Sequence, residues 1–175
     1  ISASVAPTSD LREAVEAALD ANIVVVAAPG SRTESDLVQY PAAIDGVVAV
    51  GSVNLGGNLA DTSVAGKEIV ITAPGVDIQS TGRNGQYRRA SGTSSATAIV
   101  SGAVALIRSR YPDLSAKEVV HRLTSTAVDK GAPGRDEEYG YGVLDVVAAL
   151  TADVPPLAGD ATPSTSTNPN PTPTT

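Results

Sequence analysis

Residues 23–28 read Ile-Val-Val-Val-Ala-Ala and carry no polar side chain. A β-strand with apolar side chains on both faces needs cover on both faces, and a parallel sheet flanked by helices provides it. Pro29-Gly30 ends this run, and runs typical of buried strands follow at residues 46–53 and 68–72. The sequence therefore predicts three strands of a mainly parallel sheet.

Helical patterns alternate with these strands. The predicted helices cover residues 10–21, 94–110 and 115–127, and a last short helix begins near residue 145. Asp10 and Glu13 have capping-box spacing at the start of the first helix. The second helix has few polar residues, so we expect it to be buried nearly all round, with Gly102 permitting a close neighbour. Strands that alternate with helices are typical of an α/β domain.

Two further segments interrupt or follow this pattern. Asn84-Gly85 lies between short strand-like stretches and predicts a β-hairpin turn.

The composition changes near Asp153, and the segment that follows is rich in Pro, Thr, Ser and Asn. We therefore predict one domain at residues 1–152 and a disordered linker at residues 153–175, either a free terminus or a stalk. The chain lacks Met and opens on an apolar/polar alternation, so we expect a fragment that begins inside a domain.

The composition excludes several classes of function. A net charge of −7 argues against a nucleic-acid partner, because phosphate binding needs a concentrated basic surface. There is no Cys, so neither a disulfide framework nor a Cys-based metal site is expected. No loop has convincing calcium-ligand spacing, no Gly-rich phosphate loop follows the first strand, and we expect no metal and no cofactor.

Ser94 lies where the small-residue helix is predicted to begin, two residues after Gly92. A serine there experiences the positive end of the helix dipole, and nearby free N–H groups could hold a developing negative oxygen. That position suits a nucleophile. It suits an ordinary helix N-cap equally well, and local physics alone favours the cap.

The segment around Ser94 resembles a known signature. Residues 92–102, GTSSATAIVSG, are similar to the Gly-Thr-Ser-x-Ala-x-Pro-x-x-x-Gly signature at the active serine of subtilases. Other segments that resemble this family follow in the family's order, at residues 24–30, 40–52, 73–81 and 139–145. The likeness spans residues 1 to about 150, which chance does not explain.

The resemblance implies the C-terminal half of a three-layer subtilisin-like fold and a serine endopeptidase acting on protein or peptide substrates. Ser94 would be the nucleophile, an upstream His the base and an upstream Asp the group that orients it. Ser31, Thr93 and the Ser94 backbone amide would surround the oxyanion. The pocket for the substrate residue before the cut would be lined by Ala27, Ala28, Pro29 and Gly30.

The sequence departs from the family pattern in two ways. The Asp-x-Gly and His-Gly-Thr contexts of the family's Asp and His do not occur, and His121 lies mid-helix beside Arg122 as an ordinary surface or boundary residue. The chain alone is therefore predicted to be inactive. Ser31 stands where the family has an oxyanion-hole Asn, whose loss from subtilisin itself lowers turnover about 10²- to 10³-fold. A shifted loop with Ser31 in a turn is the other interpretation.

These departures leave a second hypothesis open, a pseudoprotease that acts as a binding or assembly module in a secretion system. Within the family, Thr97-Ala98, the run at residues 110–114 and the Pro/Thr-rich tail look most like the mycosins. That resemblance implies an extracytoplasmic protease in the cell envelope of an actinobacterium, with the type VII secretion machinery as partner. Membrane anchoring would come through a C-terminal helix that this chain does not contain.

Overall fold

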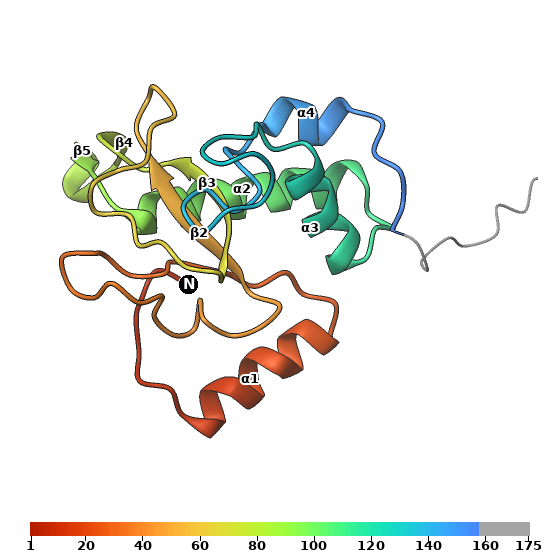
Figure 1. The fold of residues 1–175 in the computed structure, drawn as a ribbon, viewed down its shortest axis with the longest axis horizontal. Helices are drawn as coiled ribbons and strands as arrows, with labels where there is room; N and C mark the ends of the chain where they lie inside the picture. Colours follow the sequence, from red (N-terminus) through yellow and green to blue (C-terminus); the bar gives the residue numbers. More distant parts are fainter. Residues whose placement is uncertain (158–175) are drawn as a thin grey trace, which may run out of the picture.

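The computed structural model describes residues 1–157. Its centre is a parallel sheet of three strands in the order β1-β2-β3, made by Val26–Ala27, Val48–Val53 and Ile69–Pro74. Helix α1 (Ser9–Asp20) covers one face of this sheet, while α2 (Thr93–Arg110), α3 (Ala116–Ser125) and α4 (Val146–Thr151) lie on the other side (Figure 1). The predicted α/β fold with helices on both faces of a parallel sheet is confirmed.

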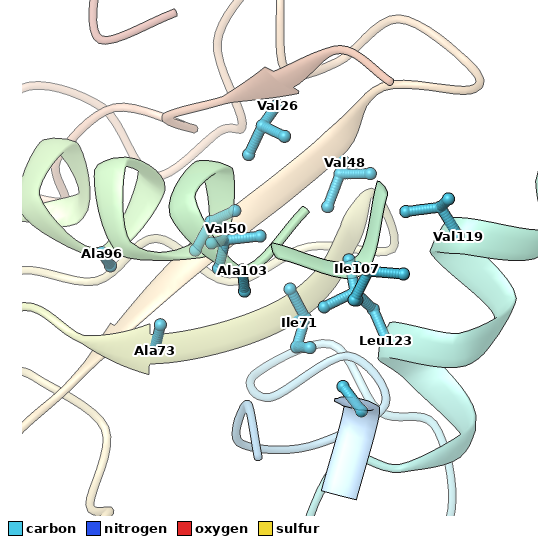
Figure 2. Packing of buried hydrophobic residues seen from close by; sticks show 12 residues of the cluster. Val26, Val48, Val50, Ile71, Ala73, Ala96, Ala103, Ile107, Val119 and Leu123 are labelled. Atoms are coloured by element: carbon cyan, nitrogen blue, oxygen red, sulfur yellow. The ribbon is translucent and has the colours of Figure 1, made fainter. Parts of the chain in front are cut away.

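The alternation of side chains along the strands divides the core in two. Val48 and Val50 of β2 point toward α2, where they meet Ala103 and Ile107 (Figure 2). Ala49, between them, points to the opposite face and packs with Val15 of α1. Successive strand residues face opposite sides of a sheet, so one apolar run serves both layers. The small core residues are consistent with the near absence of aromatic side chains.

The first strand is shorter than predicted. The sequence predicts a strand over residues 23–28, whereas β1 contains only Val26–Ala27. Ile23 is 53% exposed, and its N–H donates to the Ala18 carbonyl at 3.0 Å, so the chain is still leaving α1 at this point. On the outer edge of β1, the Ile1 amino group donates to the Val26 carbonyl at 2.6 Å. The start of the chain therefore lies alongside the sheet.

Helix α1 begins earlier than its sequence pattern indicates. Its N-cap is Thr8, whose hydroxyl accepts the Leu11 N–H at 3.2 Å, so the predicted cap at Asp10 is wrong. Asp10 instead lies in the first turn, where its carboxylate faces the positive end of the dipole. At α3, Ser115 and Glu118 form a complete capping box.

Helix α2 is not buried nearly all round, contrary to the prediction. One side packs on the sheet, but Ala98, Ser101, Ala105 and Leu106 are exposed, Leu106 by 51%. A Cβ added at Gly102 would meet no atom within 4 Å among the described residues, so the close neighbour expected there is missing. Small side chains fit a buried or an exposed helix face, and the composition therefore does not distinguish the two.

The predicted hairpin is present. Strand β4 (Ile78–Thr81) pairs antiparallel with β5 (Tyr87–Ala90), and the turn contains a 3-10 segment, η1 (Arg83–Gly85). Asn84 and Gly85 have φ values of 55° and 69°, a backbone conformation that Asn and Gly tolerate best.

The predicted linker at residues 153–175 falls mostly outside the described residues, since 158–175 are not among them. The residue just before it is bonded to α3: both terminal nitrogens of Arg122 donate to the Ala152 carbonyl, at 3.0 and 2.8 Å. The Nε2 atom of His121 lies 3.1 Å from the Pro155 carbonyl oxygen. Within residues 1–157, none of the helices combines the length and apolarity needed to cross a membrane.

Candidate active site

Ser94 is the second residue of α2, and its side chain is exposed. The N-cap is Gly92, and no side chain caps this end of the helix. Ser94 is therefore not the N-cap that local physics favoured. The Ser95 N–H donates to the Gly92 carbonyl at 3.1 Å, so the Thr93 and Ser94 N–H groups are the ones that can donate to a group placed beside the Ser94 hydroxyl.

The backbone before Ser94 is fixed by β3 and the loop after it. The Gly92 N–H donates to the Gly75 carbonyl at 2.7 Å, and the Ser91 hydroxyl accepts the Asp77 N–H at 2.9 Å. A Cβ at Gly75 would lie 2.8 Å from the Gly92 carbonyl oxygen, so only glycine permits this approach. Gly92 itself has a φ of 148°, which lets the chain turn sharply into the helix.

Thr93 links the start of α2 to the loop after β1. Its hydroxyl donates to the Gly30 carbonyl at 2.9 Å, and the residue is 6% exposed. The hydroxyl proton is therefore engaged within the domain. This contact supports a positioning role for Thr93 more directly than the oxyanion role that the family resemblance implies.

Ser31 immediately precedes a turn, and its carbonyl accepts the Glu34 N–H at 2.9 Å. Its Oγ atom is 2.8 Å from the Thr33 Oγ1 atom and also accepts the Thr33 N–H at 3.4 Å. Ser31 forms an antiparallel bridge with Ser63. Its hydroxyl thus has partners in its own loop, although the residue reaches the same cavity as Ser94.

That cavity has a volume of about 470 Å³. Five predicted site residues line it, namely Ala28, Gly30, Ser31, Thr93 and Ser94. Residues that the sequence analysis did not assign to the site also line it, namely Ser2, Ala3, Ser4, Glu34, Thr62, Ser91 and Gly92. The extended alternation at the start of the chain was the available signal for residues 2–4, because such a segment can lie beside a buried strand.

Two predicted substrate-binding residues do not line the cavity. Ala27 is fully buried, and its side chain packs in the core on the α1 side of the sheet. Its neighbour Ala28 points the other way, as strand alternation requires, and reaches the cavity. Pro29 is buried, and its carbonyl accepts the Gln39 N–H at 2.9 Å. Ala27 and Pro29 are therefore outside the lining of the Ser94 cavity, and their place in a substrate pocket stays a prediction.

His121 lies on α3 and is absent from the lining of the Ser94 cavity. Its Nδ1 atom is 3.1 Å from the Ser125 hydroxyl oxygen, and its other ring nitrogen faces Pro155. Glu34 is the single titratable side chain among the described residues that line the cavity. The described residues therefore place no histidine base beside Ser94.

A parallel sheet between helices, with an exposed serine at an uncapped helix start beside a cavity, is one arrangement found among α/β serine hydrolases. The chain belongs to the subtilase family of serine endopeptidases, since the model described as "Subtilase family" matches residues 1–142. It is 44% identical over 142 residues to Subtilisin DY of Bacillus licheniformis. That match covers 79% of this chain and 51% of the relative, so the chain spans about half the length of this curated relative.

Solved structures agree with the fold. MycP1 with its N-terminal propeptide removed superposes with a TM-score of 0.76 at 31% identity, covering 88% of this chain and 60% of that one. Fervidolysin from Fervidobacterium pennivorans, a keratinolytic enzyme related to subtilisin, gives a TM-score of 0.78 at 28% identity, covering 87% and 26%. A chain of an intact ESX-5 inner membrane complex gives 0.71 at 33% identity, covering 92% and 44%.

Proposed function

We propose that this chain is the nucleophile-bearing part of a serine endopeptidase, with Ser94 as the nucleophile. The observation that carries the proposal is the exposed Ser94 hydroxyl, which lies on a cavity at the first turn of a helix without a side-chain cap. The hydroxyl is accessible to a substrate, and the backbone N–H groups beside it can stabilise negative charge.

In this proposal the Ser94 oxygen attacks the carbonyl carbon of a peptide bond and gives its proton to a histidine base. The C–N bond then breaks, and the histidine returns the proton to the leaving amine. Water hydrolyses the resulting acyl-serine by the same route. The Ser94 N–H and the helix dipole would stabilise the oxyanion. Thr93 and the Ser91–Asp77 contact would hold the backbone in place for the attack.

The histidine and its orienting aspartate would come from a preceding part of the parent chain. Two surfaces support this origin. The exposed face of α2 has no cover within residues 1–157, and a cavity of about 320 Å³ lies between Ile1, the edge of β1 and Val104 of α2. A preceding half of the domain would cover both surfaces and bring the base to Ser94. Without it, the chain is expected to be inactive.

A fluorophosphonate probe, which reacts only with activated serines, tests this proposal. The chain alone should label at the background rate, whereas the chain joined to its preceding half should label on Ser94. Ser95→Ala is the matched control, because Ser95 is the next residue of the same helical turn. Rapid labelling of the chain alone, or labelling of the joined protein that survives Ser94→Ala, would contradict the proposal.

A second candidate, a pseudoprotease that serves as a binding or assembly module, has its own support. Both side chains assigned to the oxyanion hole have hydrogen-bond partners inside the domain: Ser31 with Thr33, and Thr93 with Gly30. A weak oxyanion hole would leave the fold intact and the turnover low. Unlabelled Ser94 in the joined protein, with the domain folded, favours this candidate.

We place the parent protein among the mycosin-like, exported subtilases of an actinobacterial envelope, with the type VII secretion machinery as partner. Support comes from the likeness to MycP1, described as an essential component of the type VII (ESX-1) secretion system, at 35% identity and a TM-score of 0.71. Membrane anchoring would require a helix beyond Thr175. Fractionation of the native host into envelope and cytosol, with an antibody to this chain, tests the location.

A further inference from the structure

Among the described residues that line the Ser94 cavity, only Glu34 has an ionisable side chain. It lies in the turn after Ser31, and its N–H donates to the Ser31 carbonyl at 2.9 Å. The other lining residues are Ser, Thr, Ala and Gly, all neutral and small. The cavity is therefore a neutral space with one carboxylate at its border.

Charged residues of both signs are close to this border in the sequence, although Glu34 alone lines the cavity among the described residues. Asp36 lies two residues from Glu34, and Asp61 immediately precedes the cavity residue Thr62. Arg32 is the nearest cation in the sequence, but its side chain does not line the cavity, and its N–H pairs with the Thr62 carbonyl. Within residues 1–157 no ion pair joins Glu34 to a cation. Its carboxylate is thus available to a ligand.

We propose that this cavity binds a basic side chain of the substrate, Lys or Arg, and that Glu34 pairs with its cationic end. The inference rests on the proposed function, since it assigns the substrate class at the same site. A volume of about 470 Å³ accommodates a long side chain, and Ala28 and Gly30 leave room for its aliphatic stem. A carboxylate beside a guanidinium or ammonium group forms charge-assisted hydrogen bonds, which are the stronger kind.

The test compares two amides that differ in charge but not in shape: N-acetyl-arginine methylamide and its neutral citrulline counterpart. Each is titrated into the isotope-labelled 175-residue chain, and binding is followed by amide chemical shifts. The arginine amide should bind up to about fivefold more tightly, the upper end of what one exposed ion pair contributes. Its shifts should map to residues 28–34 and 91–94. Glu34→Gln, which keeps the side-chain shape, should abolish the preference.

Glu13→Gln is the matched control, because Glu13 is an exposed residue of α1 outside the cavity and the change removes the same charge. It should leave the preference intact. Equal binding of the two amides, shifts mapped elsewhere, or an equal loss of preference in both variants would overturn the proposal. The amides bind without any bond being broken, so this result is independent of whether Ser94 reacts with a fluorophosphonate.

Discussion

The two ends of α2 are built differently. At its C-terminal end, the Tyr111 hydroxyl donates to the Leu150 carbonyl at 2.7 Å, and the Arg122 guanidinium lies 4.2 Å from the centre of the Tyr111 ring. At its N-terminal end, Ser94 is exposed on an open cavity and no side chain caps the helix. We call the C-terminal end of α2 the closed end, because packing and hydrogen bonds cover it. We call the N-terminal end the open end, because it presents the exposed Ser94 hydroxyl to a cavity.

Along α2, the contacts that stabilise the fold therefore lie at one end, and the serine proposed to react lies at the other. At the closed end, α3 is bonded to Ala152 and Pro155, and both α3 and α4 pack against α2. The open end is held by the Gly92 N–H and the Thr93 hydroxyl, which position Ser94 without engaging its hydroxyl. Groups without internal partners are available to a substrate, and regions that bind ligands commonly have low local stability.

The change expected to have the largest effect is Ser94→Ala at the open end. In the chain joined to its preceding half, turnover should fall about 10⁶-fold, the size known for subtilisin itself. The free energy of unfolding should change by less than about 0.5 kcal/mol, because the side chain is exposed. Peptide hydrolysis and urea unfolding measure the two effects. A loss of stability above 1.5 kcal/mol, on the order of a buried change, would contradict the separation.

The next largest effect is expected at the closed end, from Arg122→Ala. Arg122 is 8% exposed, and its loss removes two hydrogen bonds to the Ala152 carbonyl and uncovers the Tyr111 ring. We expect a loss of about 2–3 kcal/mol in the free energy of unfolding. Arg110→Ala is the control, because Arg110 is exposed and lies 5.3 Å from the same ring centre. It should cost less than about 0.5 kcal/mol; equal losses would show that Arg122 has no special role.

These contrasts also show what the sequence could predict. The spacing of Gly92, Thr93 and Ser94 correctly placed a serine at the start of a helix, because that local geometry depends on neighbouring residues. The exposed face of α2 was not predictable, since Ala and Ser side chains fit either environment. The lining residues Ser2–Ser4 were missed because the order of strands across a sheet is set by the tertiary fold. Ala27 was assigned to the pocket through the family resemblance, and the residues gave no check on it, because the phase of a strand's alternation cannot be read when all its side chains are apolar.

A smaller effect is expected from Ser31→Asn at the open end. The Ser31 hydroxyl is bonded to Thr33, and the longer Asn amide could reach the oxyanion instead. Turnover of the joined protein should rise about tenfold. This is part of the 10²- to 10³-fold loss in turnover known for removing the oxyanion-hole asparagine of subtilisin. Ser35→Asn makes the same exchange in the same loop, at a residue that does not line the cavity. An equal rise in both variants, or none in Ser31→Asn, would count against an oxyanion role for this position.

The smallest effects on the free energy of unfolding are expected from changes to Thr93 and Thr97, which are one turn apart on α2. The Thr93 hydroxyl donates to the Gly30 carbonyl, so Thr93→Val should cost about 1 kcal/mol in the free energy of unfolding and Thr93→Ser should restore most of it. The Thr97 hydroxyl is buried and has no hydrogen-bond partner among the described residues. Thr97→Val keeps the shape and removes this unpaired group, so it should be neutral or stabilise by up to about 1 kcal/mol.

Urea unfolding of the chain measures both variants against the same wild type. Opposite signs would show that the open end of α2 carries one engaged hydroxyl and one without a partner, as the contacts indicate. A cost for Thr97→Val as large as that for Thr93→Val would mean that Thr97 has a partner, such as a buried water, that holds this end of the helix. More of the hydroxyl groups at the open end would then have hydrogen-bond partners than the protein contacts indicate. The exposure of Ser94 would be the one difference left between the two ends of α2.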